Sequence, residues 1–372
     1  MKKVAIVQRT LVQYRREFFD GLKNALAEEG VELTLIYGKQ SKDEGLKNDE
    51  MDLEWGKYIP NITIKLGSKN LIWQPCLNDL KDKDLVIVEQ ANKLLLNYFL
   101  ILVKRFYGIK LAFWGHGRDR NLEVESLLNK FKYLFIKKCD WWFAYTSGVR
   151  SFLINKGYSE HKITDVQNAI DTQFLRKKYL EIDSSDIENI KMELGIMSEH
   201  IGIFCGSMYA EKRIDFIVEC CLHIKQKIED FHMIFVGAGV DAKLAIDASE
   251  KYDWIHYVGP KFGEDRVKYF KVAAIQMMPG AVGLGVLDSF TLETPLITTY
   301  NPSHGPEIDY IEDGVNGIIT NDNVDEYTHA IIDLLSSGKY INMIENCKKS
   351  AQKYTIENMI ENFKTGILKA VH

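Results

Sequence analysis

The fold is decided by the stretch "VAAIQMMPGAVGLGVLDSFTLETPLITT", residues 272–299. Its first part, 272–280, begins as a short apolar run of the kind that forms a buried strand, and "TPLITT" (294–299) is a second such run. A Pro-Gly turn, two further glycines and a segment of helical length separate them. A strand, a glycine-rich turn, a helix and another strand make one repeat of a parallel sheet. We therefore predict a parallel α/β fold for this part of the chain.

The same alternation runs along the whole sequence, with amphipathic helical patterns between the apolar runs, for example near 93–107 and 122–138. The predicted strands are 3–8, 31–38, 84–90, 109–117, 139–147, 200–207, 231–239, 254–260, 272–280 and 294–299. Because the pattern restarts between 169 and 200, we predict two Rossmann-like, doubly wound domains, 1–168 and 169–355. A last helix, 356–372, is expected to pack back on the first domain.

Length and composition agree with this division. A chain of 372 residues is long enough for two cores. Six cysteines with no metal-type spacing suit reduced thiols in a cytoplasmic protein. The N-terminal segment 3–8 reads as a strand and not as a signal peptide. The longest apolar run, 94–103, is half of what a membrane span needs.

Charge is unevenly distributed along the chain. Up to Asn168 there are 27 Lys and Arg against 21 Asp and Glu, a balance of +6, whereas the remainder holds 20 against 31, a balance of −11. Two stretches, 97–110 and 129–142, set lysines and an arginine among aromatic residues. They suit peripheral contact with an anionic membrane, although core helices with lysines on their wet face give the same pattern. We expect no nucleic-acid partner.

Functional residues are expected in the loops that follow the strands. In parallel sheets, ligands lie at the carboxyl ends of strands, where helix N-termini present N–H groups. "FCGSMYAEKRIDFIVECC" (204–221), "IFVGAG" (234–239), the stretch 258–299 and "GPEIDYIEDGVNGII" (305–319) stand in this order. Together they resemble the family-four glycosyltransferases, which have the GT-B fold, and the resemblance covers nearly the whole chain.

The resemblance implies a donor site for a UDP- or GDP-linked sugar. Lys212, six residues after Gly206, matches the family's phosphate-binding lysine, and an ammonium suits a diphosphate as a point charge. Ser207 stands where the family usually has an arginine, so Arg213 or backbone N–H groups are expected to share that task. Gly237 belongs to the family's Val-Gly-x-Gly turn.

The glycine-rich turn is the second part of the implied donor site. Asp288 matches the second glutamate of the family's Glu-x7-Glu pair, which hydrogen-bonds the ribose, while the first position is Gly280. Val282, Gly283, Leu284 and Gly285 would present N–H groups to the diphosphate, and few anions are expected beside it. A tight turn that binds nothing is the plain alternative. Other residues implied in donor binding are Pro260, Lys261 and Phe262 at the nucleobase, and Glu307.

The resemblance also assigns residues in the first domain. His116, in a Gly-His-Gly turn after a strand, matches a histidine that faces the donor sugar and the reacting centre. Arg118 and Arg120 either steer an anionic acceptor or are simply solvated. A further set of acceptor contacts is expected in the first loop: Arg9, Tyr14, Arg15 and Arg16. Glu293, where the family usually has glycine, is expected on the outer face of a helix end, without a role.

The implied reaction is sugar transfer with retention of anomeric configuration, without a dedicated nucleophile, metal or cofactor. His116, Lys212 and Asp288 are the implied catalytic residues. "DKD" (82–84) precedes a strand, so we interpret it as a solvated turn. The acceptor is expected to be a glycan, lipid-linked, in surface polysaccharide synthesis at the inner face of the cytoplasmic membrane.

Three other functions fit parts of the sequence. A non-hydrolysing UDP-sugar epimerase of GT-B fold would convert donor without an acceptor. A non-catalytic partner subunit would bind nucleotide and turn nothing over, which suits the departures at Ser207 and Gly280. A dinucleotide-binding dehydrogenase is disfavoured, because "GAGVDAK" (237–243) lacks the third glycine of that motif.

Overall fold

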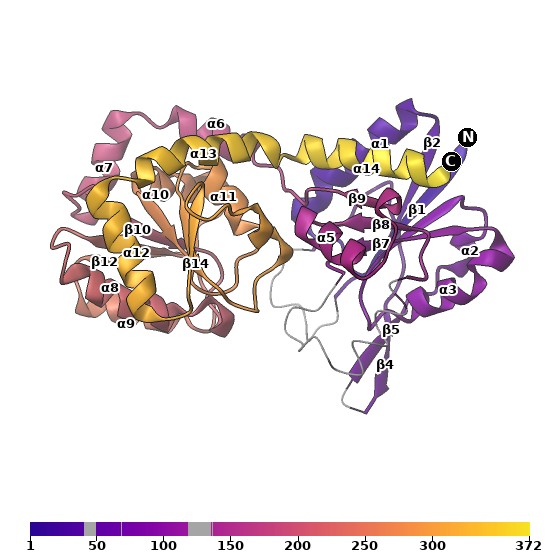
Figure 1. Cartoon of the computed structure of the whole chain (residues 1–372), viewed down its shortest axis with the longest axis horizontal. Helices are drawn as coiled ribbons and strands as arrows, with labels where there is room; N and C mark the ends of the chain where they lie inside the picture. The colour runs from indigo at the N-terminus through magenta and orange to yellow at the C-terminus, as the bar shows by residue number, and fades with distance from the viewer. Residues whose placement is uncertain (41–49, 68, 118–134, 136) are drawn as a thin grey trace. The chain divides into compact units, whose positions relative to one another are not determined.

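The structure is a computed structural model, which describes residues 1–40, 50–67, 69–117, 135 and 137–372 (Figure 1). It divides the chain into two compact units. One consists of Met1–Asp171 together with Thr355–His372, and the other of Thr172–Tyr354. Each unit is built on its own parallel sheet with helices on both faces.

The first unit holds a sheet in which seven described strands are ordered β3-β2-β1-β6-β7-β8-β9, all paired in parallel. Their bounds are β1 Lys2–Gln8, β2 Val31–Tyr37, β3 Lys57–Tyr58, β6 Leu85–Glu89, β7 Lys110–Gly115, β8 Trp141–Ala144 and β9 Ile163–Asp165. The helices around it are α1 Arg16–Glu28, α2 Leu77–Leu80, α3 Leu95–Tyr107, α5 Ser147–Asn155 and α14 Ile356–Val371.

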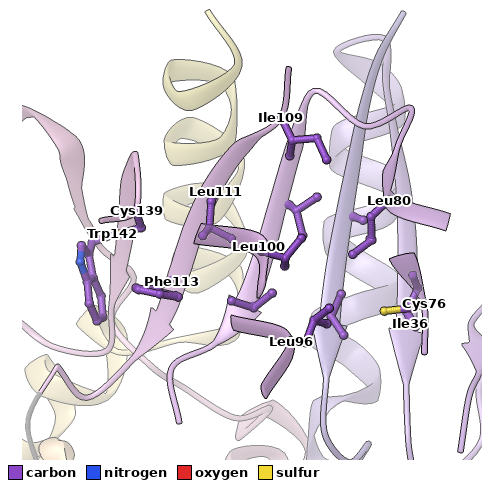
Figure 2. Packing of buried hydrophobic residues seen from close by; sticks show 14 of the residues in the cluster. Ile36, Cys76, Leu80, Leu96, Leu100, Ile109, Leu111, Phe113, Cys139 and Trp142 are labelled. Carbon is purple, nitrogen blue, oxygen red and sulfur yellow. The ribbon is translucent and has the colours of Figure 1, made fainter. Parts of the chain in front are cut away.

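Helix α3 packs against the core of this sheet (Figure 2). Leu96 and Leu100, one turn apart, lie in the same buried cluster as Leu111 and Phe113 of β7 and Trp142 of β8. A spacing of four residues places side chains on the same helix face. Ile101 and Tyr107 of α3 are partly buried against the same cluster, whereas Leu102 and Phe106 are exposed.

Helix α14 completes the core of the first unit. The Phe363 ring lies 4.9 Å from the rings of Phe18 and Trp114, and it stacks on Phe143 at 4.7 Å. Aromatic pairs at this separation add to the free energy of burial. The last sixteen-residue helix is therefore an integral part of the first unit.

The second unit has six described strands, ordered β12-β11-β10-β13-β14-β15 and paired in parallel. They are β10 Ile201–Cys205, β11 His232–Val236, β12 Ile255–Gly259, β13 Ile275–Met277, β14 Leu296–Thr299 and β15 Gly317–Thr320. Its helices are α6 Gln173–Glu181, α7 Ser184–Leu194, α8 Ile214–Lys225, α9 Ala242–Lys251, α10 Val267–Val272, α11 Gly285–Thr291, α12 Val324–Ser337 and α13 Tyr340–Lys353.

The strand order reverses between β10 and β13. The chain winds outward from β10 to β12, then returns to β13 on the other side of β10. At such a switch point the loops after two neighbouring strands diverge and leave room for a ligand. The segments that follow β10 and β13 are the two in which the sequence analysis placed most donor-binding residues.

The predicted fold is confirmed, and all ten predicted strands are present: β1 begins one residue earlier than predicted, and the other nine are shorter. The sequence analysis missed β3, β9, β15 and an antiparallel hairpin made of β4 Ile62–Leu66 and β5 Lys69–Trp73. The helix predicted near 122–138 lies mostly outside the described residues, as do Lys130 and Lys132 of the basic-aromatic stretch 129–142.

Three smaller features bear on the sequence analysis. In the described part of the chain, no helix is both long and apolar enough to cross a membrane. All six cysteines are free thiols. Asp82 pairs with Lys3 at 2.7 Å, and Asp84 accepts hydrogen bonds from the Lys3 N–H and the Lys2 ammonium at 2.8 and 2.9 Å. Lys3 and then Lys83 lower the pKa of Asp82, and the Lys3 N–H together with Lys2 lowers that of Asp84.

A histidine pair in the second unit makes stability depend on pH. Nδ1 of His232 lies 3.0 Å from Nε2 of His256 on the neighbouring strand. Burial lowers the pKa of His256 to about 4, and burial and then Lys225 lower that of His232. In the unfolded chain both titrate near pH 6.5, so below that pH the unfolded state binds more protons.

We therefore expect the free energy of unfolding to fall by about 3 kcal/mol as the pH drops from about 6.5 to about 4. Urea midpoints measured across this range test it. His256→Gln should flatten the dependence, whereas His329→Gln, which alters an exposed histidine of α12, should leave the slope as it is. An equal slope in the His256 variant would contradict this origin.

Candidate functional site

The loop after β10 is held against the loop after β11 by backbone contacts. The Gly206 N–H donates to Val236 O at 3.0 Å, and the Met208 N–H donates to Ala238 O at 2.8 Å. A Cβ on Gly237 would fall far inside van der Waals contact of Gly206 O, and Gly237 has φ +146°, a conformation that favours glycine. Gly237 is thus required by the close approach of two loops. Ser207, the residue after Gly206, is exposed.

Lys212 is held at the switch point by the loop that follows β13. It ends a short 3₁₀ helix, Ala210–Lys212, and its ammonium donates to Ala281 O. The Ala281 N–H in turn donates to Glu211 O at 2.7 Å. These two hydrogen bonds place the positive charge of Lys212 at the loop that runs from Gly280 to α11.

Gly280 has no room for the glutamate that the family usually carries there. It is buried, and a Cβ on it would overlap Glu211 O and crowd the Lys212 backbone. The loop approaches the Lys212 segment so closely that only glycine fits. The missing carboxylate at this position is therefore a consequence of how the two loops pack.

Gly280→Ala is expected to lower the free energy of unfolding by about 3 kcal/mol, because the overlap falls on backbone atoms that cannot rotate away. Gly283→Ala is the matched control, since a Cβ there meets no atom within 4 Å. It should change stability by less than about 0.5 kcal/mol. Thermal unfolding of both variants checks this, and equal melting temperatures would contradict it.

The turn that contains Val282 is held by His304, a residue that was not predicted from the sequence. The Val282 N–H donates to Nδ1 of this buried histidine at 3.0 Å, and Nε2 lies 2.7 Å from Thr299 O. Nδ1 thus accepts and Nε2 donates, as in a neutral ring. The Gly305 N–H also donates to Val282 O, at 2.6 Å. The backbone N–H and C=O of Val282 are thus both hydrogen-bonded, and the residue is buried. Val282 therefore anchors the turn.

The start of α11 presents its first N–H groups next to this anchor. Gly283 and Leu284 precede the helix and Gly285 is its first residue. All three are only partly buried. The first N–H groups of a helix have no acceptor within it, so this turn can donate hydrogen bonds to an anion.

Asp288 is committed to a partner that the sequence analysis missed. Both of its carboxylate oxygens accept from Arg266, each at 2.8 Å, in a bidentate pair. Asp288 is 7% exposed, and burial raises its pKa while Arg266 opposes the shift. Arg266, just ahead of α10, lies beside Cys205 at the end of β10. A second cation thus stands at the switch point.

Arg213 forms an ion pair within the second unit. It adopts φ +58° between the 3₁₀ turn and α8, and its guanidinium pairs with Asp322 and lies 4.2 Å from the Phe216 ring centroid. Its charge is already balanced within the unit, so it is a weaker candidate for the phosphate contact than the sequence suggested.

The remaining predicted donor residues lie in two loops of the second unit. Pro260 and Phe262 are exposed after β12, and Lys261 between them is partly buried. Glu307 is buried, with its carboxylate next to Gly305. It therefore lies under the turn anchored by Val282 and His304.

The expectation for Glu293 was wrong. Its side chain is only 14% exposed and pairs with Arg176 at 2.6 Å and Lys348 at 3.7 Å. Its φ is +57°, in the region that glycine prefers. The ion pairs join α6 and α13 at the end of α11, so Glu293 has a structural role.

In the first unit, His116 follows β7 directly and is exposed. Its ring lies edge-on to Tyr145, with centroids 4.7 Å apart. This places the imidazole at the carboxyl edge of the sheet, where ligands of parallel sheets bind. Arg118 and Arg120 lie outside the described residues.

Of the predicted acceptor residues in the first loop, Arg15 is corrected. It is buried, donates to Asn168 Oδ1 at 2.6 Å and lies 5.1 Å from the Trp114 ring centroid. It holds the first unit together and is not displayed to a ligand. Tyr14 and Arg16 are exposed, and Arg9 is partly buried near Glu89.

Comparison with known proteins agrees with this geometry. Residues 199–337 match the family model of the glycosyl transferases group 1. No curated protein matches. Among solved structures, a glycosyltransferase from Rickettsia africae ESF-5 is 15% identical, with 99% of this chain and 98% of that one covered and a TM-score of 0.68.

Two further structures share the fold. Anabaena Alr3699/HepE, solved with UDP and also with UDP-glucose, is 12% identical in its UDP complex, with 99% and 100% of the chains covered and a TM-score of 0.67. The lipopolysaccharide outer core galactosyltransferase WaaB is 14% identical, with 98% and 99% covered and a TM-score of 0.67. Residues 199–337 thus carry the match to the glycosyl transferases group 1, and the whole chain shares its fold with solved glycosyltransferases.

Proposed function

We propose that the chain transfers a sugar from a UDP- or GDP-linked donor to a lipid-linked glycan, with retention of anomeric configuration. The observation that carries the proposal is the position of the Lys212 ammonium. Its ammonium is tied to Ala281 O, beside the N–H groups of Gly283 to Gly285. A cation next to a cluster of N–H donors suits a diphosphate, whose negative charge increases as the glycosidic bond breaks.

In the proposed reaction the bond from the sugar C1 to the diphosphate breaks, and a bond from C1 to the acceptor oxygen forms on the same face. The acceptor hydroxyl gives its proton to an oxygen of the leaving diphosphate, so no side-chain nucleophile is needed. Lys212 and the turn stabilise the leaving group. His116 stabilises the sugar side.

The other residues bind the donor. Asp288 accepts hydrogen bonds from the ribose hydroxyls, held in place by Arg266. Pro260, Lys261 and Phe262 contact the base. The UDP-glucose complex of the Anabaena protein supports a nucleotide-sugar donor, and the similarity to the lipopolysaccharide outer core galactosyltransferase WaaB supports a glycan acceptor. An acceptor on a lipid places the reaction at the inner face of the cytoplasmic membrane, in surface polysaccharide synthesis.

Thermal shift with a panel of UDP, GDP, ADP and their sugars tests the donor. A ligand at 100 times its Kd should stabilise the protein by about 2.7 kcal/mol. No shift with any of them would contradict the proposal. Conversion of the donor sugar without acceptor would indicate an epimerase, and binding without turnover on any glycan lipid would indicate a partner subunit.

A further inference from the structure

The β4–β5 hairpin of the first unit carries an apolar face that the unit does not bury. In its antiparallel register Ile62 lies opposite Trp73, Ile64 opposite Leu71 and Leu66 opposite Lys69. Opposed residues share one face of a hairpin, and residues two apart along a strand do too. Ile62, Ile64 and Leu66 therefore lie side by side, and all three are exposed, Leu66 by 66%. Figure 1 shows the hairpin extending from the rest of the unit.

This face continues onto helix α3. The Trp73 ring, at the base of the hairpin, lies edge-on to Phe99 at 5.9 Å. Leu102 and Phe106 follow Phe99 by three and seven residues, a spacing that keeps them on one helix stripe. They are 79% and 87% exposed, whereas Leu96 and Leu100 are buried. We call Ile62, Ile64, Leu66, Phe99, Leu102 and Phe106 the apolar strip.

The charges around the apolar strip are of one sign. Segments 57–73 and 93–110 contain seven Lys and Arg and no Asp or Glu, in a chain whose net charge is −5. Lys57 pairs with Asp79 and Lys104 pairs with Asp140, both acids outside these segments. Arg105 on α3 and Lys65, on the opposite face of the hairpin from Ile64 and Leu66, are exposed.

We propose that the apolar strip docks into the surface of an anionic membrane. Exposed aliphatic and aromatic side chains flanked by Lys and Arg match the two attractions of such a surface, apolar burial below the headgroups and Coulomb attraction to them. A symmetric dimer would bring the same cations of two copies face to face, which opposes self-association through this strip. The inference rests on the proposed function in that the acceptor is attached to a lipid.

The test is flotation of the full chain with vesicles of phosphatidylcholine alone and with one-third phosphatidylglycerol. The wild type should bind the anionic vesicles and bind the neutral ones much more weakly. Leu66→Ser, Leu102→Ser and Phe106→Ser combined should weaken binding at least about 30-fold. Lys65→Gln with Arg105→Gln should weaken it about 25-fold on anionic vesicles only. The matched control combines three exposed apolar residues of the other unit, Leu180→Ser, Met192→Ser and Met197→Ser.

Equal flotation of the wild type and the strip variant would overturn the proposal. The proposal would also be overturned if the wild type were a dimer, the strip variant were a monomer, and neither protein bound vesicles. UDP and GDP binding, measured on the same samples, separates the two proposals. Nucleotide binding without flotation removes the docking surface alone, and flotation without nucleotide binding removes the proposed function alone.

Discussion

Lys212→Ala is expected to weaken binding of UDP or GDP by about 30-fold, the largest effect on affinity of any single change in the donor site. A hydrogen bond to a charged group contributes about 1.5–3 kcal/mol, and the loss falls on the diphosphate. An ammonium has three N–H donors, so donation to Ala281 O is compatible with donation to phosphate oxygens. Isothermal titration of the nucleoside diphosphate measures the change.

Two companion variants separate charge from packing. Lys212→Met keeps the length of the side chain and should bind as weakly as the alanine variant, because the lost group is the cation. Lys227→Ala removes an exposed lysine after α8 and should bind like the wild type. If Lys212→Met bound nucleotide as tightly as the wild type, another group would hold the diphosphate, with Arg266 as the first candidate.

A strand could be predicted from the sequence where it is buried on both faces of its sheet. The central strands are continuous apolar runs, since helices cover both faces of a parallel sheet. The strands that escaped prediction lack that signal. All five residues of β4 are exposed, β3 and β9 have only two and three residues, and β15 begins with glycine.

Motif spacing could propose candidate residues such as Lys212, six residues after Gly206, but not partners that are distant in sequence. Arg266 and Asp288, 22 residues apart, become a pair only when the 3₁₀ turn Gly263–Arg266 packs against α11, and neither residue by itself predicts the other. His304 is found only through its hydrogen bond to Val282. Arg15 misled because a buried arginine and a ligand-binding one look alike in sequence.

His116→Ala is expected to lower kcat by about 100-fold while leaving the Kd for UDP or GDP within about twofold. Removing one polar group that stabilises charge in the transition state typically costs this much. His116 belongs to the first unit, whereas the residues proposed to bind the nucleotide belong to the second. The variant should therefore separate catalysis from nucleotide binding. Single-turnover sugar transfer and nucleotide titration on the same protein measure the two quantities.

The control for this prediction is His161→Ala, an exposed histidine of the same unit, which should leave kcat as it is. His116→Gln keeps a hydrogen-bonding side chain and should recover part of the lost rate, whereas a purely structural histidine would show a loss of stability in both variants. The ring contacts Tyr145 edge-on, so Tyr145→Phe, which keeps an aromatic ring there, should preserve its position. Unchanged turnover in His116→Ala would remove this residue from the reaction, and with it the proposal that the sugar is stabilised from the first unit.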